Sequence, residues 1–391
     1  MFHRLVKPLK SNSFLMFGAR GTGKSTFIKN YLPEAFRIDL LEDEWESRYT
    51  RRPDLLYTDL KSKLVDKPKL EWVFIDEVQK IPKLLDVVHR LIEEKKLKFA
   101  LTGSSARKLK RGRANLLAGR AFMNSMFPLC QAELGRDFDL SAVLRWGALP
   151  KVWGPGVVDD KNEFLRTYSQ TYLKEEILQE QLVRDGASFR DFMEIAALEN
   201  GDTLNFSKIA RDLRIDTKTV QNFFQILEDT LAGFFLPAFH KSVRKSQRHQ
   251  PKFYLFDLGV KNAMARDLDT ILRPGTSAFG MALEHFVVLE TYRLNEYFKT
   301  DYRLAHYRVD PGGEIDLVLS KRQKVIAVEI KSTDRVDPVE VKHFARTASA
   351  LSPQSMYFVS QDTVATRIAD VECLHWKDFL GKLWAQNEAR E

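Results

Sequence analysis

The sequence has few cysteines and no long apolar run. Its 391 residues include only two cysteines, Cys130 and Cys373, which are far apart in the chain. Two distant thiols exclude a disulfide-stapled scaffold and a cysteine-rich zinc module. No apolar run approaches the roughly 18 residues that span a bilayer, and the first ten residues contain no apolar leader. We therefore expect a cytoplasmic protein with no membrane contact.

The sequence also lacks a strong excess of one charge. It has 61 lysines and arginines against 53 aspartates and glutamates, and the net charge of +8 permits a polyanionic partner without requiring one. With 44% hydrophobic and 29% charged residues, the composition excludes wholesale disorder. The length predicts two or three domains, although no internal repeat or low-complexity linker marks their limits.

The first 150 residues alternate apolar segments with amphipathic ones. The candidate strands are residues 13–17, 36–40, 72–75, 98–102 and 122–127. Because helical segments, such as residues 25–32, separate these strands, the pattern predicts an α/β fold with a parallel sheet covered on both faces. Long amphipathic helices follow from about residue 164, and strands return between residues 302 and 330. We therefore predict domains at residues 1–155, 156–250 and 251–391.

The segment Gly18–Ser25 matches the phosphate-loop pattern G-x-x-x-x-G-K-[ST] at every fixed position. Glycines let backbone amides turn around phosphate oxygens, and the N-terminus of the following helix adds partial positive charge. Lys24 would pair with the β- and γ-phosphates, and Ser25 would ligate Mg²⁺. The predicted nucleotide-binding residues are Gly18, Gly21, Thr22, Gly23, Lys24, Ser25 and Thr26.

An apolar strand that ends in two carboxylates supports this interpretation. Residues Trp72–Ile75 precede Asp76 and Glu77, which is the Walker B form. Asp76 would hold Mg²⁺, and Glu77 would be the general base that polarises the attacking water. A nucleotide-binding switch needs no second carboxylate, and nothing in the sequence suggests the acceptor site of a small-molecule kinase. Hydrolysis is therefore the favoured reaction.

The middle of the sequence has helix-turn-helix spacing. Residues Thr203–Leu213 and Thr217–Leu227 are predicted helices joined by the turn Arg214–Asp216. A strand-like segment at 231–239 and a strongly basic segment at 241–252 complete the order of a winged helix. Two interpretations stay open: the basic segment contacts the DNA backbone, or the winged helix is a packing and oligomerisation module with a solvated basic loop.

The C-terminal segment contains a nuclease-like pattern. A predicted helix carries Glu284, and a predicted hairpin carries Asp316 and Glu329, with Lys331 just after it. Asp-x(n)-Glu-x-Lys is the signature of the restriction-endonuclease-like fold, in which carboxylates hold Mg²⁺ and the lysine steadies developing charge. The alternative is a related fold without cleavage activity.

These blocks, in this order, resemble a widespread family of poorly characterised prokaryotic AAA-type ATPases. Members of that family carry an AAA domain, a winged-helix middle and a restriction-endonuclease-like C-terminal domain of unknown function. The resemblance covers nearly the whole chain. It rests on residues 18–25, 74–80, 101–105, 117–120, 252–259, 313–316 and 329–331. It implies binding and hydrolysis of ATP with Mg²⁺, and it implies no particular substrate.

The resemblance also suggests two further catalytic residues. AAA-type ATPases place a polar sensor after the strand at residues 98–102, where this sequence has serine or threonine, and Ser104 is the residue that we name. They place an arginine finger near Arg120, where it would neutralise transition-state charge on a neighbouring subunit's nucleotide. That role would require a homo-oligomer. The alternative for Arg120 is an arginine at a helix C-terminus that interacts with the helix dipole.

Two functional hypotheses follow. In the first, an ATPase drives or gates a winged helix and a nuclease-like tail on DNA, and DNA stimulates its turnover. In the second, ATP orders an interface with another protein and the tail is catalytically silent.

Overall fold

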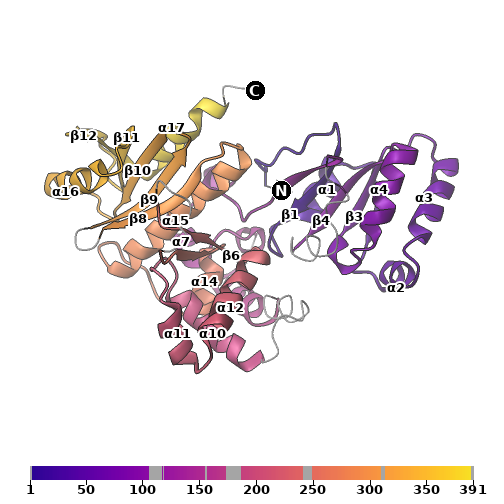
Figure 1. The fold of residues 1–391 in the computed structure, drawn as a ribbon, viewed down its shortest axis with the longest axis horizontal. Helices are drawn as coiled ribbons and strands as arrows, with labels where there is room; N and C mark the ends of the chain where they lie inside the picture. Colours follow the sequence, from indigo (N-terminus) through magenta and orange to yellow (C-terminus); the bar gives the residue numbers. More distant parts are fainter. Residues whose placement is uncertain are drawn as a thin grey trace.

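The computed structural model describes residues 2–104, 117, 119–154, 156–172, 186–240, 249–309 and 313–388. Two β-sheets lie at opposite ends of the molecule in Figure 1, and a mostly helical region joins them. Within the described ranges, no helix combines the length and the apolar character needed to cross a membrane.

The N-terminal sheet is parallel, with strand order β2-β3-β4-β1-β5. Its strands are β1 Ser13–Phe17, β2 Phe36–Asp39, β3 Trp72–Asp76, β4 Lys98–Gly103 and β5 Ala121–Ser125. The helices are α1 Lys24–Tyr31, α2 Asp43–Arg51, α3 Leu55–Asp66 and α4 Leu84–Lys95. Alternate β1 side chains enter two cores: Leu15 and Phe17 pack toward α2–α4, whereas Phe14 and Met16 pack toward α1. The predicted parallel sheet with two covered faces is therefore confirmed.

The middle region consists of helices and one two-stranded antiparallel sheet. Its elements are α6 Gln131–Leu134, α7 Leu140–Trp146, α8 Val158–Thr167, α10 Gly186–Leu198, α11 Phe206–Leu213, α12 Thr217–Asp229, β6 Gly233–Leu236, β7 Lys252–Leu255 and α14 Leu258–Met264. The predicted helix pair is present, but α11 starts later than predicted because Asn205 caps it by accepting a hydrogen bond from the Lys208 amide. Phe224 of α12 is fully buried in the hydrophobic core to which α10, α11, α12 and β7 all contribute.

The basic segment at 241–252 needs a correction at its C-terminal end. Residues 241–248 lie outside the described residues. Lys252, however, starts strand β7, is only 4% exposed, and forms ion pairs with Glu284 and Glu314. Lys252 is therefore not part of an exposed surface that contacts DNA, because its charge is satisfied inside the protein.

The C-terminal region is a mixed sheet between helices. Strand order is β12-β13-β11-β10-β9-β8, and β9 and β10 form the predicted antiparallel hairpin. Its elements are α15 Ser277–Tyr297, β8 Arg303–Val309, β9 Gly313–Lys321, β10 Lys324–Ile330, α16 Pro338–Ser349, β11 Ser355–Ser360, β12 Thr366–Ile368, β13 Val371–His375 and α17 Trp376–Glu388. Helices α15 and α17 pack on one face, and α16 packs on the other.

Helix α15 is tied to both other regions by a buried polar cluster. Arg293 donates to the Leu129 carbonyl at 3.2 Å and to the Phe256 carbonyl at 2.8 Å. Glu290 accepts from the Gln131 amide at 2.8 Å. These bonds link α15 to the chain that leaves β5 and to the end of β7, so they position the helix that carries Glu284.

The buried Glu290 carboxyl predicts a pH dependence of stability. Burial raises the pKa of Glu290 to about 7, although Arg293 opposes the shift. Between about pH 4.5 and pH 7 the folded protein therefore holds a proton that the unfolded chain has released. Stability is expected to fall as pH rises through this window, by at most about 1.4 kcal/mol per pH unit. Urea unfolding of wild type and Glu290→Gln across the window measures this, because the variant lacks the titrating group. Parallel stability curves would contradict the prediction.

Candidate functional site

The predicted phosphate loop joins β1 to α1 at the carboxyl end of the parallel sheet. Gly21 and Gly23 adopt positive φ angles of 79° and 94°, which disfavour any other residue. A Cβ on Gly18 would lie 2.1 Å from the Met126 carbonyl oxygen, so the loop needs glycine there to pack against the end of β5. The loop backbone therefore depends on the two glycines of the pattern, Gly18 and Gly23, and also on Gly21 between them.

Lys24 is 5% exposed, and its ammonium donates to the carbonyls of Gly18 and Ala19 at 2.8 and 3.2 Å. The positive charge of Lys24 is therefore held next to the loop backbone at Gly18 and Ala19. Thr22 is buried and donates to the Ala19 carbonyl, whereas Ser25 is partly exposed and Thr26 is exposed in the first turn of α1. The loop places its one lysine where it would meet phosphate oxygens.

The two Walker B residues lie at the end of β3. Asp76 is 3% exposed and accepts a hydrogen bond from the Thr102 hydroxyl of the neighbouring strand β4. Glu77 has a left-handed backbone (φ 56°), and its amide donates to the same Thr102 oxygen at 3.1 Å. Thr102 was not predicted as a site residue. The hydroxyl of Ser25 and the carboxylate of Asp76 are the hard oxygen donors that Mg²⁺ prefers, so this donor set fits the ion.

Ser104, the predicted sensor, lies near Glu77 but is not its closest partner. The hydroxyl of Ser104 is 3.5 Å from Glu77 Oε2, at the limit of hydrogen bonding. The side-chain amide of Gln79 lies between them and donates to both Glu77 Oε2 and Ser104 Oγ. Sequence reasoning missed Gln79, although it lies in the segment 74–80 on which the family resemblance partly rests.

Arg120 lies in the turn before β5, on the surface. Its guanidinium donates to Glu93 of α4, and this hydrogen bond is the main reason that the pKa of Glu93 is lowered. Of the predicted helical stretch before Arg120, residues 114–116 and 118 lie outside the described residues. Its role as an arginine finger stays a prediction.

The phosphate loop is also contacted from the other two regions. Tyr168, in a π-helical turn at Tyr168–Tyr172, donates to the Arg20 carbonyl at 2.8 Å. Arg4 donates to the Thr22 carbonyl at 2.9 Å and to the hydroxyl of Tyr297, the last residue of α15, at 3.2 Å. The loop therefore touches the middle region directly and the C-terminal region through Arg4.

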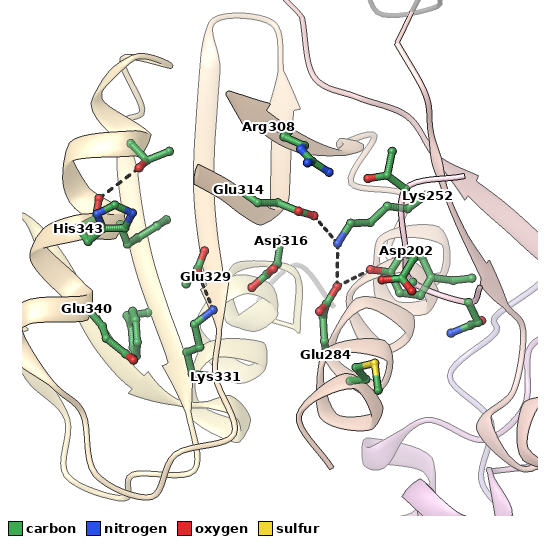
Figure 2. A pocket seen from close by; sticks show the side chains of 18 of the residues that line it. Asp202, Lys252, Glu284, Arg308, Glu314, Asp316, Glu329, Lys331, Glu340 and His343 are labelled. Carbon is green, nitrogen blue, oxygen red and sulfur yellow. Dashed lines mark hydrogen bonds and ion pairs between the residues drawn. The ribbon is translucent and has the colours of Figure 1, made fainter. Parts of the chain in front are cut away.

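The four predicted nuclease-like residues line one cavity of about 720 Å³ between the middle and C-terminal regions. Figure 2 shows their origins: Glu284 comes from α15, Asp316 from β9, and Glu329 and Lys331 from the end of β10. The hairpin register and the long helix bring them together, as the sequence pattern predicted.

The carboxyl groups of the hairpin are buried and partly satisfied. Asp316 accepts from the Ile330 amide at 2.8 Å, and burial together with the Glu284 and Glu329 carboxylates raises its pKa well above the ordinary value. Glu329 accepts from Lys331 at 2.5 Å, while its other oxygen is buried with no partner among the described residues. Burial also raises the pKa of Glu329, against the effect of Lys331.

Lys252 and Tyr254 of β7 complete this cavity from the middle region. The Lys252 ammonium lies 3.1 Å from Glu284 and 2.6 Å from Glu314. Figure 2 draws both ion pairs as dashed lines. Burial alone would lower the pKa of Lys252, but Glu284, Asp316 and Glu314 raise it above the ordinary value. Tyr254 donates to the same Glu284 oxygen at 2.7 Å. Glu284 is therefore neutralised by a protein cation.

The cavity does not fit the Mg²⁺ that the nuclease-like pattern implies. Among the described residues, no three His, Cys, Asp or Glu side chains are arranged to hold a metal ion. Glu284 is paired with Lys252, Glu329 is paired with Lys331, and Asp316 accepts from the Ile330 amide. The side chains predicted from sequence are all present, but two of the three carboxylates already have protein cations as partners.

A phosphate loop after β1 and two carboxylates at the end of β3, with β4 between these strands in a parallel sheet of this order, define a P-loop ATPase domain. Three family models match in turn: an AAA domain at residues 10–135, a domain of unknown function (DUF8612) at 137–270, and a domain of unknown function (DUF4143) at 279–379. The order of these matches confirms the predicted resemblance to the poorly characterised AAA-type ATPases that have a C-terminal domain of unknown function.

The chain is similar to two proteins whose names describe them only as uncharacterized. A Mycobacterium tuberculosis protein is 24% identical over 263 residues, which cover 67% of this chain and 58% of the relative. A Methanocaldococcus jannaschii protein is 22% identical over 283 residues, which cover 64% of this chain and 62% of the relative. The chain thus spans about three fifths of the length of these relatives.

Two solved structures share little with this one. A signal transduction ATPase with a tetratricopeptide repeat sensor, from Pyrococcus horikoshii, has a TM-score of 0.22 and 13% identity over 74% of this chain and 45% of that chain. A Vibrio cholerae protein has a TM-score of 0.23 and 9% identity over 96% of this chain and 98% of that chain. Neither TM-score indicates a shared overall fold.

Proposed function

We propose that this protein binds ATP and hydrolyses it with Mg²⁺ at the carboxyl end of the N-terminal sheet. One observation carries the proposal: the loop that holds Lys24 and the carboxylates of Asp76 and Glu77 follow strands β1 and β3, which flank β4 in the same parallel sheet. The carboxyl ends of parallel strands meet at one edge, where α/β proteins bind their ligands.

Each predicted residue has a role in this proposal. Gly18, Gly21, Thr22, Gly23 and Thr26 shape or line the phosphate site, and Lys24 balances the charge of the β- and γ-phosphates. Ser25 and Asp76 would hold Mg²⁺, which neutralises phosphate charge when bound. Glu77 accepts a proton from the attacking water. Ser104 and Arg120 stay proposed as a sensor and as an arginine finger that acts in a homo-oligomer.

We keep three proposed domains, an ATPase at 1–155, a winged-helix region at 156–250 and a restriction-endonuclease-like domain at 251–391. The α11–α12 pair supports the winged helix, and the Glu284, Asp316, Glu329 and Lys331 cluster supports the nuclease-like tail. Because β7 pairs with β6, a second boundary after α14 fits the structure better than residue 250.

Coupling of hydrolysis to DNA binding or processing gives a direct test. The exposed Lys218 on α12 and the segment at 241–251 are the proposed DNA contacts. Duplex DNA is expected to raise steady-state ATP turnover several-fold at low salt, and the gain should shrink steeply between about 50 and 200 mM salt. A Lys218→Ala variant should need more DNA for half-maximal stimulation. An ATP turnover rate that DNA does not change at any salt concentration would contradict DNA coupling and would point to a protein partner.

A second candidate is a nucleotide-switched protein-interaction module with a catalytically silent tail. The pairing of Glu284 with Lys252 favours it, because that carboxylate is not free to ligate a metal ion.

In this case neither wild type nor Lys331→Ala is expected to nick supercoiled plasmid in Mg²⁺ or Mn²⁺, measured by gel electrophoresis. Nicking by the wild type that is lost in Lys331→Ala would show that the tail cleaves DNA and would contradict the silent-tail candidate.

A further inference from the structure

Gln79 contacts the proposed general base but belongs to none of the motifs of the phosphate loop. It lies in the short 3-10 helix Val78–Lys80 that follows Glu77, and it is only 7% exposed. A glutamine at such a turn is usually solvated. Here the tight turn at Glu77, whose φ is 56°, directs the Gln79 side chain back toward the carboxyl end of the sheet.

The Gln79 amino group makes two hydrogen bonds at the catalytic edge. It donates to Glu77 Oε2, and it donates to Ser104 Oγ at 2.9 Å. Ser104 itself is 3.5 Å from the same Glu77 oxygen, so the amide of Gln79 is the nearer partner of the carboxylate. A donor at one oxygen fixes the plane of a carboxylate and leaves its second oxygen to accept a proton.

The other end of the amide shows how strongly this orientation is selected. Gln79 Oε1 is buried and has no hydrogen-bond partner among the described residues. An unsatisfied buried carbonyl is unfavourable, but the reversed amide would place oxygen against the Glu77 carboxylate, which is worse. A Cβ on Gly103 would lie 2.9 Å from Gln79 Oε1, so the amide would have to shift if β4 ended in any other residue.

We propose that Gln79 is a positioning residue for the Glu77 carboxylate, an inference that rests on the proposed ATP hydrolysis. In that reaction the water oxygen bonds to the γ-phosphorus while a water proton passes to Glu77. The bond from that phosphorus to the bridging oxygen breaks, and its electron pair stays on ADP. Gln79 holds the Glu77 plane during this step, and Ser104 holds the Gln79 amide.

The test replaces Gln79 with methionine, which has a similar shape and no amide. In the full chain, kcat for ATP hydrolysis is expected to fall about 10- to 100-fold, the effect of losing a hydrogen bond to a charged group. The KM for ATP and the Kd for a fluorescent ATP analogue should stay within about twofold, because Gln79 does not contact the phosphate loop. Gln225→Met, on the exposed face of α12, is the matched control and should keep wild-type turnover.

A second variant displaces the amide without removing it. Gly103→Ala places a methyl group against Gln79 Oε1 and should lower kcat, but the same methyl also approaches the Phe17 ring, so ATP affinity is compared only in Gln79→Met. Wild-type kcat in Gln79→Met, with Glu77→Gln inactive, would overturn the positioning role and leave the proposed ATPase intact. Loss of ATP affinity in parallel with kcat would indicate a merely structural role and also overturn it. An inactive wild type that still binds ATP would instead refute the proposed hydrolysis.

Discussion

Glu77→Gln is expected to stop ATP hydrolysis while ATP binding is retained. A general base typically contributes about 10²- to 10⁴-fold to a rate, and the glutamine amide cannot accept the proton from water. The substitution keeps the shape of the side chain, so the phosphate loop and Asp76 should be undisturbed. Steady-state turnover should fall at least about 100-fold, whereas the Kd for a fluorescent ATP analogue should change by less than about threefold.

Two further variants make this result specific. Glu44→Gln, an exposed glutamate of α2, should leave turnover unchanged. Lys24→Ala should instead lose ATP affinity, because Lys24 carries the positive charge held over the loop. Near-normal turnover by Glu77→Gln would show that another group activates the water. Loss of ATP binding in Glu77→Gln would show that Glu77 is part of the binding site.

Lys252→Met is expected to destabilise the whole chain by about 3 kcal/mol. Removal of one partner of a buried ion pair leaves an uncompensated charge, which typically costs about 3–5 kcal/mol. The lower end applies because the Glu284 and Glu314 side chains are 21% and 34% exposed and regain some water. The lost contacts also join the middle region to the C-terminal region. Urea unfolding followed by circular dichroism measures the effect.

A double variant separates charge from packing in this prediction. The double variant Lys252→Met/Glu284→Gln should lose less free energy of unfolding than the two single variants lose together. It removes both members of the pair, whereas each single variant leaves one charged member behind. Lys208→Met is the matched control: its ion pair with Glu199 is on the surface, so the loss should stay under about 1 kcal/mol. A Lys252→Met effect as small as that of Lys208→Met, or strictly additive double-variant energies, would contradict the buried ion pair.

The segments of the proposed nucleotide site could be predicted from the sequence because their chemistry lies in contiguous residues. The loop Gly18–Ser25 and the strand that ends at Asp76 each combine an apolar strand with the polar residues that follow it. Parallel packing then brings the two segments to one edge. Ser104 stays a prediction as the sensor, while Thr102 and Gln79 make the closer contacts to Asp76 and Glu77. Thr102 and Ser104 lie two residues apart, so the alternation of side chains along a strand does not distinguish them, and Gln79 lies in the 3-10 helix that follows β3.

The cavity lined by Glu284, Asp316, Glu329 and Lys331 could be predicted only in part. Its hairpin and its four predicted residues follow from a strand-turn-strand pattern and one helix, which are local features. The basic run, however, grouped Lys252 with solvated lysines, whereas strand β7 buries its charge beside Glu284 and Glu314. Charge patterning reports how many cations a segment carries and not which of them a fold encloses.

The sequence by itself determined the phosphate loop, the Walker B carboxylates, the parallel sheet and the family, because each depends on residues close together in the chain. Only the tertiary structure decided the partner of each carboxylate: the Gln79 amide for Glu77, the Thr102 hydroxyl for Asp76 and the Lys252 ammonium for Glu284. The physical reason is that hydrogen bonds and ion pairs act over a few ångströms of space. Glu284 and Lys252 are 32 residues apart, so only the packing of α15 against β7 brings them together.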